Sequence, residues 1–146
     1  MTSARDRMFH WVEVRAYCHA TEEEEKVLAA MRTVLPGAEA KREALAGHFG
    51  NPLVRLAARA ENAPVIKEAW RRIVAALGKD EVARDLEDRI DEDLVYHLRL
   101  DKQAAFLGRI ERSASGDILD LRAKVAAYPA KREVALRVVR EFVEAL

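Results

Sequence analysis

Residues 10–20, HWVEVRAYCHA, alternate between two kinds of side chain. Val12, Val14, Ala16 and Cys18 are small or aliphatic, whereas the residues between them are mostly aromatic or charged. A period of two in a segment rich in β-branched and aromatic residues is typical of a strand that buries one face. The segment therefore predicts a strand with an aliphatic buried face. Its opposite face is unusually rich in aromatic and charged residues for a plain solvent face.

The same alternation recurs at residues 53–61, 94–100 and 118–128, with an alanine-rich and weaker candidate at 39–48. Helical spacing of apolar residues separates these segments, at 21–35, 62–77, about 79–89, 102–107 and 129–146. Most strands alternate instead of forming the continuous apolar runs of a sheet that is buried on both faces. We therefore predict an α+β fold, with an antiparallel or mixed sheet and helices packed on one face. The second face stays available for a partner.

Several helix ends have local signals. Thr21 followed by Glu24 predicts a capping box at the start of the first helix. Asn62 is the expected N-cap of the second helix, and the last helix is expected to begin at Pro129. Trp70 lies within the apolar stripe of the second helix, so we expect it to anchor the core rather than to bind a ligand.

The chain has 146 residues, and we expect an N-terminal tail at 1–9 followed by a single domain at 10–146. No apolar run approaches the roughly 18 residues of a membrane-spanning helix, and the start lacks an apolar signal core. These features predict a cytoplasmic protein that does not associate with a membrane. The single cysteine, Cys18, excludes an internal disulfide and is expected to be a small core residue.

Basic and acidic residues balance at 25 each, which argues against a general nucleic-acid coat protein. The charges are nevertheless segregated along the chain. Residues 80–93 hold eight acidic side chains against two basic ones, and residues 122–132 hold four basic side chains and no acidic one. A neutral protein can therefore carry a local basic face. The acidic window is also consistent with a solvated helix end and turn.

The sequence lacks the common catalytic and phosphate-binding motifs. Neither GxGxxG, GxxxxGK[ST] nor HExxH occurs, and the three serines have no triad-like context. The histidines (His10, His19, His48 and His97) are too far apart to indicate metal spacing. We therefore predict no catalytic residue, no metal and no cofactor.

Residues 98–108, LRLDKQAAFLG, have two interpretations. In the first, Asp101 is the N-cap of a short helix that ends at Gly108. This leaves Arg99, Lys102 and Gln103 without a role. In the second, these three side chains beside a helix N-terminus bind a phosphate. The question is whether the cluster only caps local structure or also meets a charged partner.

Four segments together resemble a known family: HWVEVRAYCHATEEEEKV, GHFGNP, RLDKQAAFLG and AYPAKREVA. They are similar to an archaeal RNA-binding family that is also described as a predicted exosome subunit. The resemblance runs from about His10 to the C-terminal helix. It implies a fold similar to that of the ribosomal protein that binds 5S ribosomal RNA. It also implies RNA as a partner, together with the exosome or other RNA-processing proteins.

The resemblance places the RNA contacts within the matched motifs. It implies phosphate contacts from basic residues, hydrogen bonds to sugars or bases from polar residues, and stacking by aromatic residues. Phe49 either stacks on a base or packs internally. The expected RNA-binding residues are His48, Asn51, Arg99, Lys102, Gln103, Lys131 and Arg132, with Gly50 in the same motif as Asn51, and the expected stacking residues are Trp11, Tyr17 and Phe49.

The leading hypothesis is a non-catalytic RNA-binding protein linked to RNA processing or degradation. A first alternative is a protein–protein adaptor in an RNA-processing complex, with the acidic residues 80–93 as the docking element. A second alternative is a small enzyme that acts on a phosphorylated or nucleotide ligand. In that case His48 would be the acid–base group, and Arg99 and Lys102 would clamp the anion.

Overall fold

A computed structural model describes residues 8–46, 50–113 and 116–146. Its centre is a five-stranded sheet in the order β2-β3-β1-β5-β4, and every neighbouring pair is antiparallel. This arrangement confirms the predicted α+β class. The strands are β1 Phe9–His19, β2 Ala40–Ala46, β3 Pro52–Ala60, β4 Val95–Asp101 and β5 Ile118–Val125.

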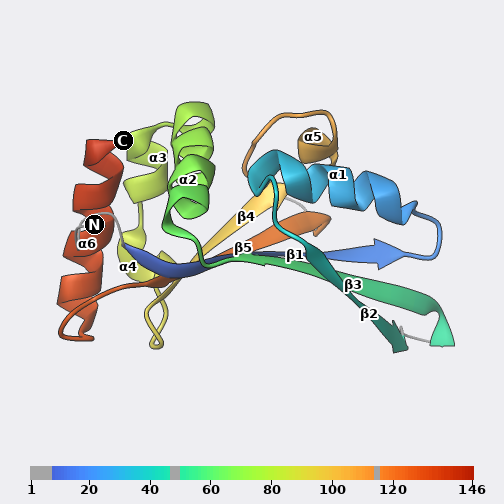
Figure 1. The fold of residues 1–146 in the computed structure, drawn as a ribbon, viewed down its shortest axis with the longest axis horizontal. Coiled ribbons are helices and arrows are strands. Elements are labelled where there is room, and N and C mark those ends of the chain that lie inside the picture. Colours follow the sequence, from blue (N-terminus) through green and yellow to red (C-terminus); the bar gives the residue numbers. More distant parts are fainter. Residues whose placement is uncertain (1–7, 47–49, 114–115) are drawn as a thin grey trace.

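The helices leave one face of the sheet open. Figure 1 shows α1, α2 and α5 above the sheet, with α3, α4 and α6 gathered at the end where β1 begins. No helix in the described part of the chain covers the opposite face. None of these helices is long and apolar enough to cross a membrane. They span α1 Glu24–Val34, α2 Ala63–Leu77, α3 Lys79–Ala83, α4 Leu86–Arg89, α5 Lys102–Phe106 and α6 Arg132–Ala145.

Two of the predicted N-caps are confirmed. The Asn62 side chain accepts a hydrogen bond from the Val65 amide at 3.4 Å, at the start of α2. The Asp101 carboxylate accepts one from the Ala104 amide at 2.8 Å, at the start of α5. Each bond satisfies a backbone amide that has no partner inside the helix. These short local contacts explain why sequence spacing located both helices correctly.

The predicted capping box of α1 is wrong. The helix begins at Glu24, and the residue at its N-cap position, Glu23, makes no capping hydrogen bond through its side chain. Thr21 instead lies in a turn that the Glu22 amide closes on the His19 carbonyl at 2.9 Å. Because of this turn, α1 begins at Glu24, two residues later than it would if Thr21 were its N-cap.

Two other helix boundaries also differ from the prediction. The last helix begins at Arg132 rather than Pro129, because Lys131 is extended, with φ −123° and ψ 148°. The predicted acidic helix at 79–89 divides into α3 and α4, since Asp85 has a left-handed backbone with φ 54°.

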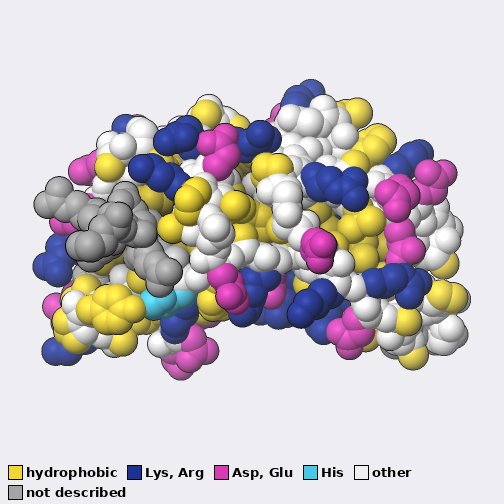
Figure 2. Space-filling view, in the orientation of Figure 1, with side chains coloured by type: hydrophobic (Ala, Val, Ile, Leu, Met, Phe, Trp, Pro, Cys, Tyr) yellow, Lys and Arg dark blue, Asp and Glu magenta, His cyan; other side chains and the backbone are white. Residues whose placement is uncertain are grey.

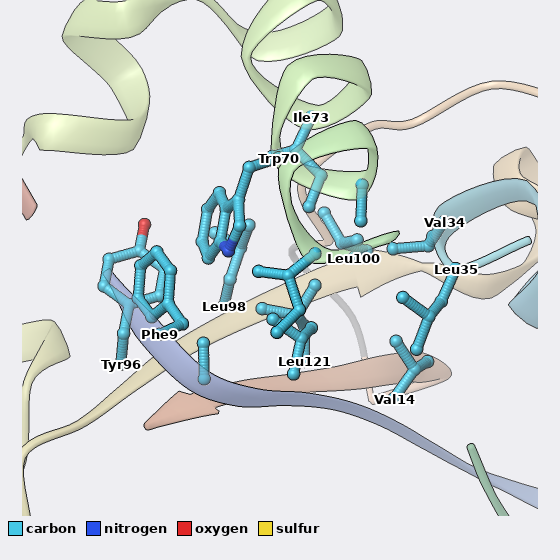
Figure 3. Close-up of a cluster of buried hydrophobic side chains, with 14 of the residues drawn as sticks. Phe9, Val14, Val34, Leu35, Trp70, Ile73, Tyr96, Leu98, Leu100 and Leu121 are labelled. Atoms are coloured by element: carbon cyan, nitrogen blue, oxygen red, sulfur yellow. The ribbon is translucent and has the colours of Figure 1, made fainter. Parts of the chain in front are cut away.

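An aromatic cluster forms one end of the core. Trp70 of α2 is 1% exposed and stacks on Phe9 of β1 with ring centroids 4.9 Å apart. Tyr96 of β4 meets the Trp70 ring edge-on at 5.3 Å (Figure 3). Cys18 is also buried on the aliphatic face of β1, and burial raises the pKa of its thiol. The predicted core positions of Trp70 and Cys18 are confirmed.

Candidate nucleic-acid interface

The outward residues of the five strands define a surface that we call the open face. Residues directly opposite in antiparallel strands point to the same side of a sheet. The buried residues of β1, which are Val12, Val14, Ala16 and Cys18, point toward the helices. The residues that alternate with them along β1 therefore point to the other side of the sheet, and so do the residues paired with these on β3 and β5. The open face carries the basic residues Arg15, Lys41, Arg55, Arg59, Arg99, Arg122 and Lys124, and the acidic residues Glu13, Glu43, Asp101 and Asp120.

Glu13 lies buried at the centre of the open face beneath two arginines. Its carboxylate forms an ion pair with Arg15 and another with Arg59, whose Nε lies 3.5 Å from Oε2. The Arg59 guanidinium also lies 4.2 Å from the centroid of the Trp11 ring. A cation at this distance interacts favourably with the π-face of the indole. One face of Trp11 is therefore already occupied.

Tyr17 presents the accessible aromatic ring of the open face. It lies at the far end of β1 and is 47% exposed. Its cross-strand partner Arg55 forms an ion pair with Glu43 of β2. The hydrogen bond and charge of Glu43 raise the pKa of Arg55, so the guanidinium beside Tyr17 stays charged. An exposed ring next to a fixed cation is an arrangement that suits a nucleotide base and its phosphate.

In the β4–β5 half of the open face, Arg99 has no ion-pair partner within the described part of the chain. Asp120 lies opposite Arg99 but pairs with Arg122 at 3.2 Å. His97 Nε2 lies 2.7 Å from Asp91 Oδ2. Burial opposes the charge of Asp91, but the hydrogen bonds from His97 and two backbone amides outweigh it and lower the pKa of this carboxyl.

The open face is a mosaic with a basic excess. Its strand residues carry three more positive than negative charges, although the chain as a whole is neutral. A shallow groove of about 520 Å³ lies over Ala57 and is lined on either side by Lys41 and Arg59, with Glu13, Glu39 and Glu61 also present. Figure 2 shows Lys and Arg side chains gathered along the lower margin, beneath the sheet, with acidic groups between them.

Lys102 is not part of this surface, because it is 3% exposed. Its Nζ donates to the Tyr17 carbonyl at 3.1 Å and lies 2.8 Å from Glu22 Oε2 and 2.7 Å from Asp117 Oδ1. An ammonium has three hydrogen-bond donors, and these partners use all of them. Gln103 donates to the same Asp117 at 3.1 Å. Lys102 and Gln103 therefore find their charged partners within the protein, whereas Arg99 has none among the described residues.

The electrostatics of Lys102 agree with this internal role. Burial opposes its charge, but hydrogen bonds and charges of Asp117 and Glu22 outweigh that effect and raise the pKa of Lys102. Burial likewise opposes the charge of Asp117, but the hydrogen bond from Lys102 outweighs it and lowers the pKa of this carboxyl. Arg99 points to the open face while Lys102 is enclosed, so the two do not form the anion clamp expected for an enzyme.

The other predicted contacts are spread over the molecule. Asn51 is exposed in the turn between β2 and β3, and the neighbouring His48 and Phe49 lie outside the described residues. Lys131 is exposed before α6, and Arg132 donates to the Ile90 carbonyl at 2.7 Å and to the Glu87 carbonyl. The start of β3, next to Asn51, and the start of α6 lie at opposite ends of the molecule (Figure 1). Asn51, Lys131 and Arg132 therefore do not form one compact site.

Sequence reasoning did not select most of the cations on the open face as candidate contacts. The signal for them was present in the alternation, because every one of them occupies a polar position of a predicted strand or of the weaker alanine-rich segment. What the alternation lacked was the strand order, which places five polar rows side by side. The missed residues are Arg15, Lys41, Arg55, Arg59, Arg122 and Lys124.

Comparison with known proteins assigns the family. A family model described as RNA binding matches residues 11–125. An RNA-binding protein of Pyrococcus abyssi is 31% identical over 144 residues, which cover 92% of this chain and 94% of the relative. The crystal structure of an Archaeoglobus fulgidus protein, described as DUF54, has a TM-score of 0.83 and 37% identity, and covers 92% of this chain and 99% of its own. A DUF54 protein of Methanothermobacter thermautotrophicus has a TM-score of 0.82 and 39% identity, with coverages of 93% and 98%. This chain therefore belongs to the RNA-binding, or DUF54, family.

Proposed function

We propose that this protein binds RNA through the open face of its sheet and does not cleave it. Arg99, Arg122 and Lys124 contact phosphates, and Tyr17 stacks on a base. The observation that carries the proposal is the basic excess on an uncovered sheet face in a member of an RNA-binding family. Phosphate contacts supply most of the affinity of such proteins, whereas aromatic platforms select accessible bases.

The ion pairs on the open face are compatible with phosphate binding. A guanidinium has five N–H donors, so an arginine that pairs with one carboxylate keeps donors for a phosphate. Arg122 uses its Nε for Asp120, which leaves its terminal nitrogens for RNA. Lys124 donates one N–H to the Asp93 carbonyl and keeps two for a phosphate. The interspersed carboxylates keep the net excess small, so we expect moderate affinity that depends strongly on salt.

The proposed RNA contacts differ from those expected from the sequence. Lys102 is left out because it is enclosed and all three of its donors bind groups within the protein. Arg132 is left out because it lies at the start of α6 and is not a residue of the open face. Asn51 and Lys131 stay predicted contacts for a longer RNA that reaches the two ends of the molecule.

Fluorescence anisotropy with a labelled single-stranded RNA at several salt concentrations tests the proposal. The double variant Arg99→Ala/Lys124→Ala removes two cations from the open face. The control, Arg137→Ala/Arg140→Ala, removes two exposed cations from α6 and so changes the net charge equally. We expect only the first variant to bind weakly, and its log–log salt slope to be smaller by about 1.4, since each phosphate contact on a single strand contributes about 0.7. Equal effects of both variants would show that the open face is not the binding surface.

A protein–protein adaptor remains the second candidate function. Within residues 80–93, Glu81 binds Arg84, Arg89 and Arg112, so part of the acidic segment stabilises the fold. Six other acidic side chains of the segment are exposed: Asp80, Asp85, Glu87, Asp88, Glu92 and Asp93. Association with the exosome is a prediction from the family resemblance. Replacing these six residues by Asn or Gln should abolish co-purification of a partner complex if they dock it, while leaving RNA affinity unchanged.

A further inference from the structure

Two exposed tyrosines lie near the two ends of the central strand. Tyr17 is near the end of β1, and Tyr128, which is 77% exposed, follows β5 and lies beside His10 at the start of β1. The loop between β5 and α6 passes below the sheet, at the end of the molecule opposite the start of β3 (Figure 1). Of the eight aromatic residues in the described part of the chain, four are buried, Trp11 is partly buried, and Tyr17, Phe106 and Tyr128 are exposed. Tyr17 and Tyr128 are therefore candidate contacts for a ligand with an aromatic or apolar face.

A β-bulge helps to place Tyr128. β1 pairs Phe9 with Val125 and Trp11 with Lys124, so His10 is an extra residue between two consecutive pairs. Such a bulge redirects a side chain that would otherwise follow the alternation. His10 is exposed, and its ring meets the Tyr128 ring edge-on at 5.9 Å, while the Tyr128 hydroxyl lies 3.3 Å from His10 Nε2. An edge-on contact leaves at least one face of the tyrosine ring accessible.

Basic side chains connect the two tyrosines. His10 and Tyr17 are seven residues apart on one strand, which corresponds to about 23 Å at the usual rise of a strand. Between them the open face carries Lys124 opposite Trp11, and Arg122 and Arg59 on either side of Glu13. Arg15 completes the row on β1 itself. Four cations, with the carboxylates of Glu13 and Asp120 between them, thus lie along β1 from one exposed ring toward the other.

We infer that an unpaired RNA strand lies along β1, with one base stacked on Tyr128 and another on Tyr17. The phosphates between these bases lie over Lys124, Arg122, Arg59 and Arg15. This inference rests on the proposed function and names its substrate class. About seven nucleotides span the distance at the stacked spacing of about 3.4 Å per phosphate, and fewer span it in an extended strand. A duplex does not fit, because pairing and stacking hide the faces of its bases.

Other exposed apolar groups do not serve this path. Trp11 lies on the path, but Arg59 covers one face of its ring. Phe106 and Leu107 are exposed on and just after α5, which packs with α1 on the helix-covered side. They provide a control surface, because RNA on the open face does not reach them.

Anisotropy with labelled oligouridines of two to twelve nucleotides, and with a blunt RNA duplex, tests the inference. Tyr17→Ala and Tyr128→Ala should each weaken binding of the long oligouridines about 5- to 150-fold, the range expected for loss of one stacked base. Tyr17→Phe and Tyr128→Phe should bind normally, as should Phe106→Ala. Affinity should rise with length until both rings are reached and then level off. A dinucleotide is too short to reach both rings. Its affinity for the double variant Tyr17→Ala/Tyr128→Ala should therefore equal its affinity for the more weakened of the two single variants.

Three results would overturn the inference while leaving RNA binding by the open face intact: normal binding by Tyr128→Ala, no change in affinity with oligonucleotide length, or duplex binding as tight as single-strand binding. In each case Arg99→Ala/Lys124→Ala would still weaken binding. If the proposed function itself is wrong, the result is different: no RNA binds to the wild-type protein, and Arg99→Ala/Lys124→Ala causes no further change. Thermal unfolding of each tyrosine variant identifies any loss that comes from misfolding.

Discussion

The ammonium of Lys102 donates a hydrogen bond to the backbone carbonyl of Tyr17 over 3.1 Å. The same group binds Glu22 in the turn after β1 and Asp117 before β5. One buried cation therefore joins α5 to the end of the central strand and to the start of its neighbour. Because the Tyr17 side chain points to the opposite face, Lys102 supports from behind the open face that we propose binds RNA.

Replacing Lys102 by Met should destabilise the fold. The substitution keeps the length of the side chain but leaves Glu22 and Asp117 without their cation and the Tyr17 carbonyl without its donor. Since removing one partner of a buried ion pair costs about 3–5 kcal/mol, and these carboxylates are partly exposed, we expect a loss of about 2–3 kcal/mol. Urea unfolding measures this loss. Gln103→Met is the matched control and should cost less than about 1 kcal/mol, because Gln103 is exposed and makes one bond to the same Asp117. Equal losses would contradict the role of Lys102.

Stability should depend on pH through this ion pair. The pKa of Asp117 is lowered in the folded state, so its contribution is present above its unfolded value of about 3.9 and is lost as pH falls further. The pKa of Lys102 is raised, so its contribution is complete below about 10.4 and is lost as pH rises through the folded pKa. The stability difference between wild type and Lys102→Met should therefore be flat from about pH 5 to 10 and should shrink on both sides. A difference that changes steadily across neutral pH would argue against this pair as its source.

Asp101 and Thr21, both predicted as helix caps from the sequence, should differ in their effect on the free energy of unfolding. Asp101→Ala removes a side chain that caps α5 and should lower the free energy of unfolding by about 1 kcal/mol. Thr21→Ala should change it by less than about 0.5 kcal/mol, because α1 begins at Glu24 and Thr21 is exposed in the preceding turn. Chemical denaturation of both variants decides the point. A loss near 1 kcal/mol for Thr21→Ala would restore the capping box.

Trp70 should tolerate one substitution better than the other. Trp70→Ala empties the centre of the aromatic cluster and should cost about 3–5 kcal/mol. Trp70→Phe keeps a ring beside Phe9 and also removes the indole Nε1, which has no hydrogen-bond partner among the described residues. We expect it to cost about half as much, since part of the lost packing is offset by removing an unsatisfied buried donor. Similar losses for both variants would mean that Nε1 finds a partner in solution.

Local features of the chain were readable from the sequence. The alternation in residues 10–20 located the buried face of β1 correctly, because covalent geometry sends successive side chains of a strand to opposite sides. Asn62 and Asp101 cap their helices as predicted, because a cap needs a partner only three residues away. The one-sided pattern also indicated correctly that the second face of the sheet is left uncovered.

The roles of individual charges depended on the tertiary structure. The partners of Lys102 on β1 and in the following turn lie 85 and 80 residues away in sequence, so no local pattern could reveal that its ammonium is enclosed. The cations of the open face form one surface only because the strand order brings β3, β1 and β5 together. Backbone geometry along a few residues is local and is therefore determined by sequence alone. Whether a charged side chain binds a neighbour or remains for a ligand is decided by distances in space, which only the folded chain defines.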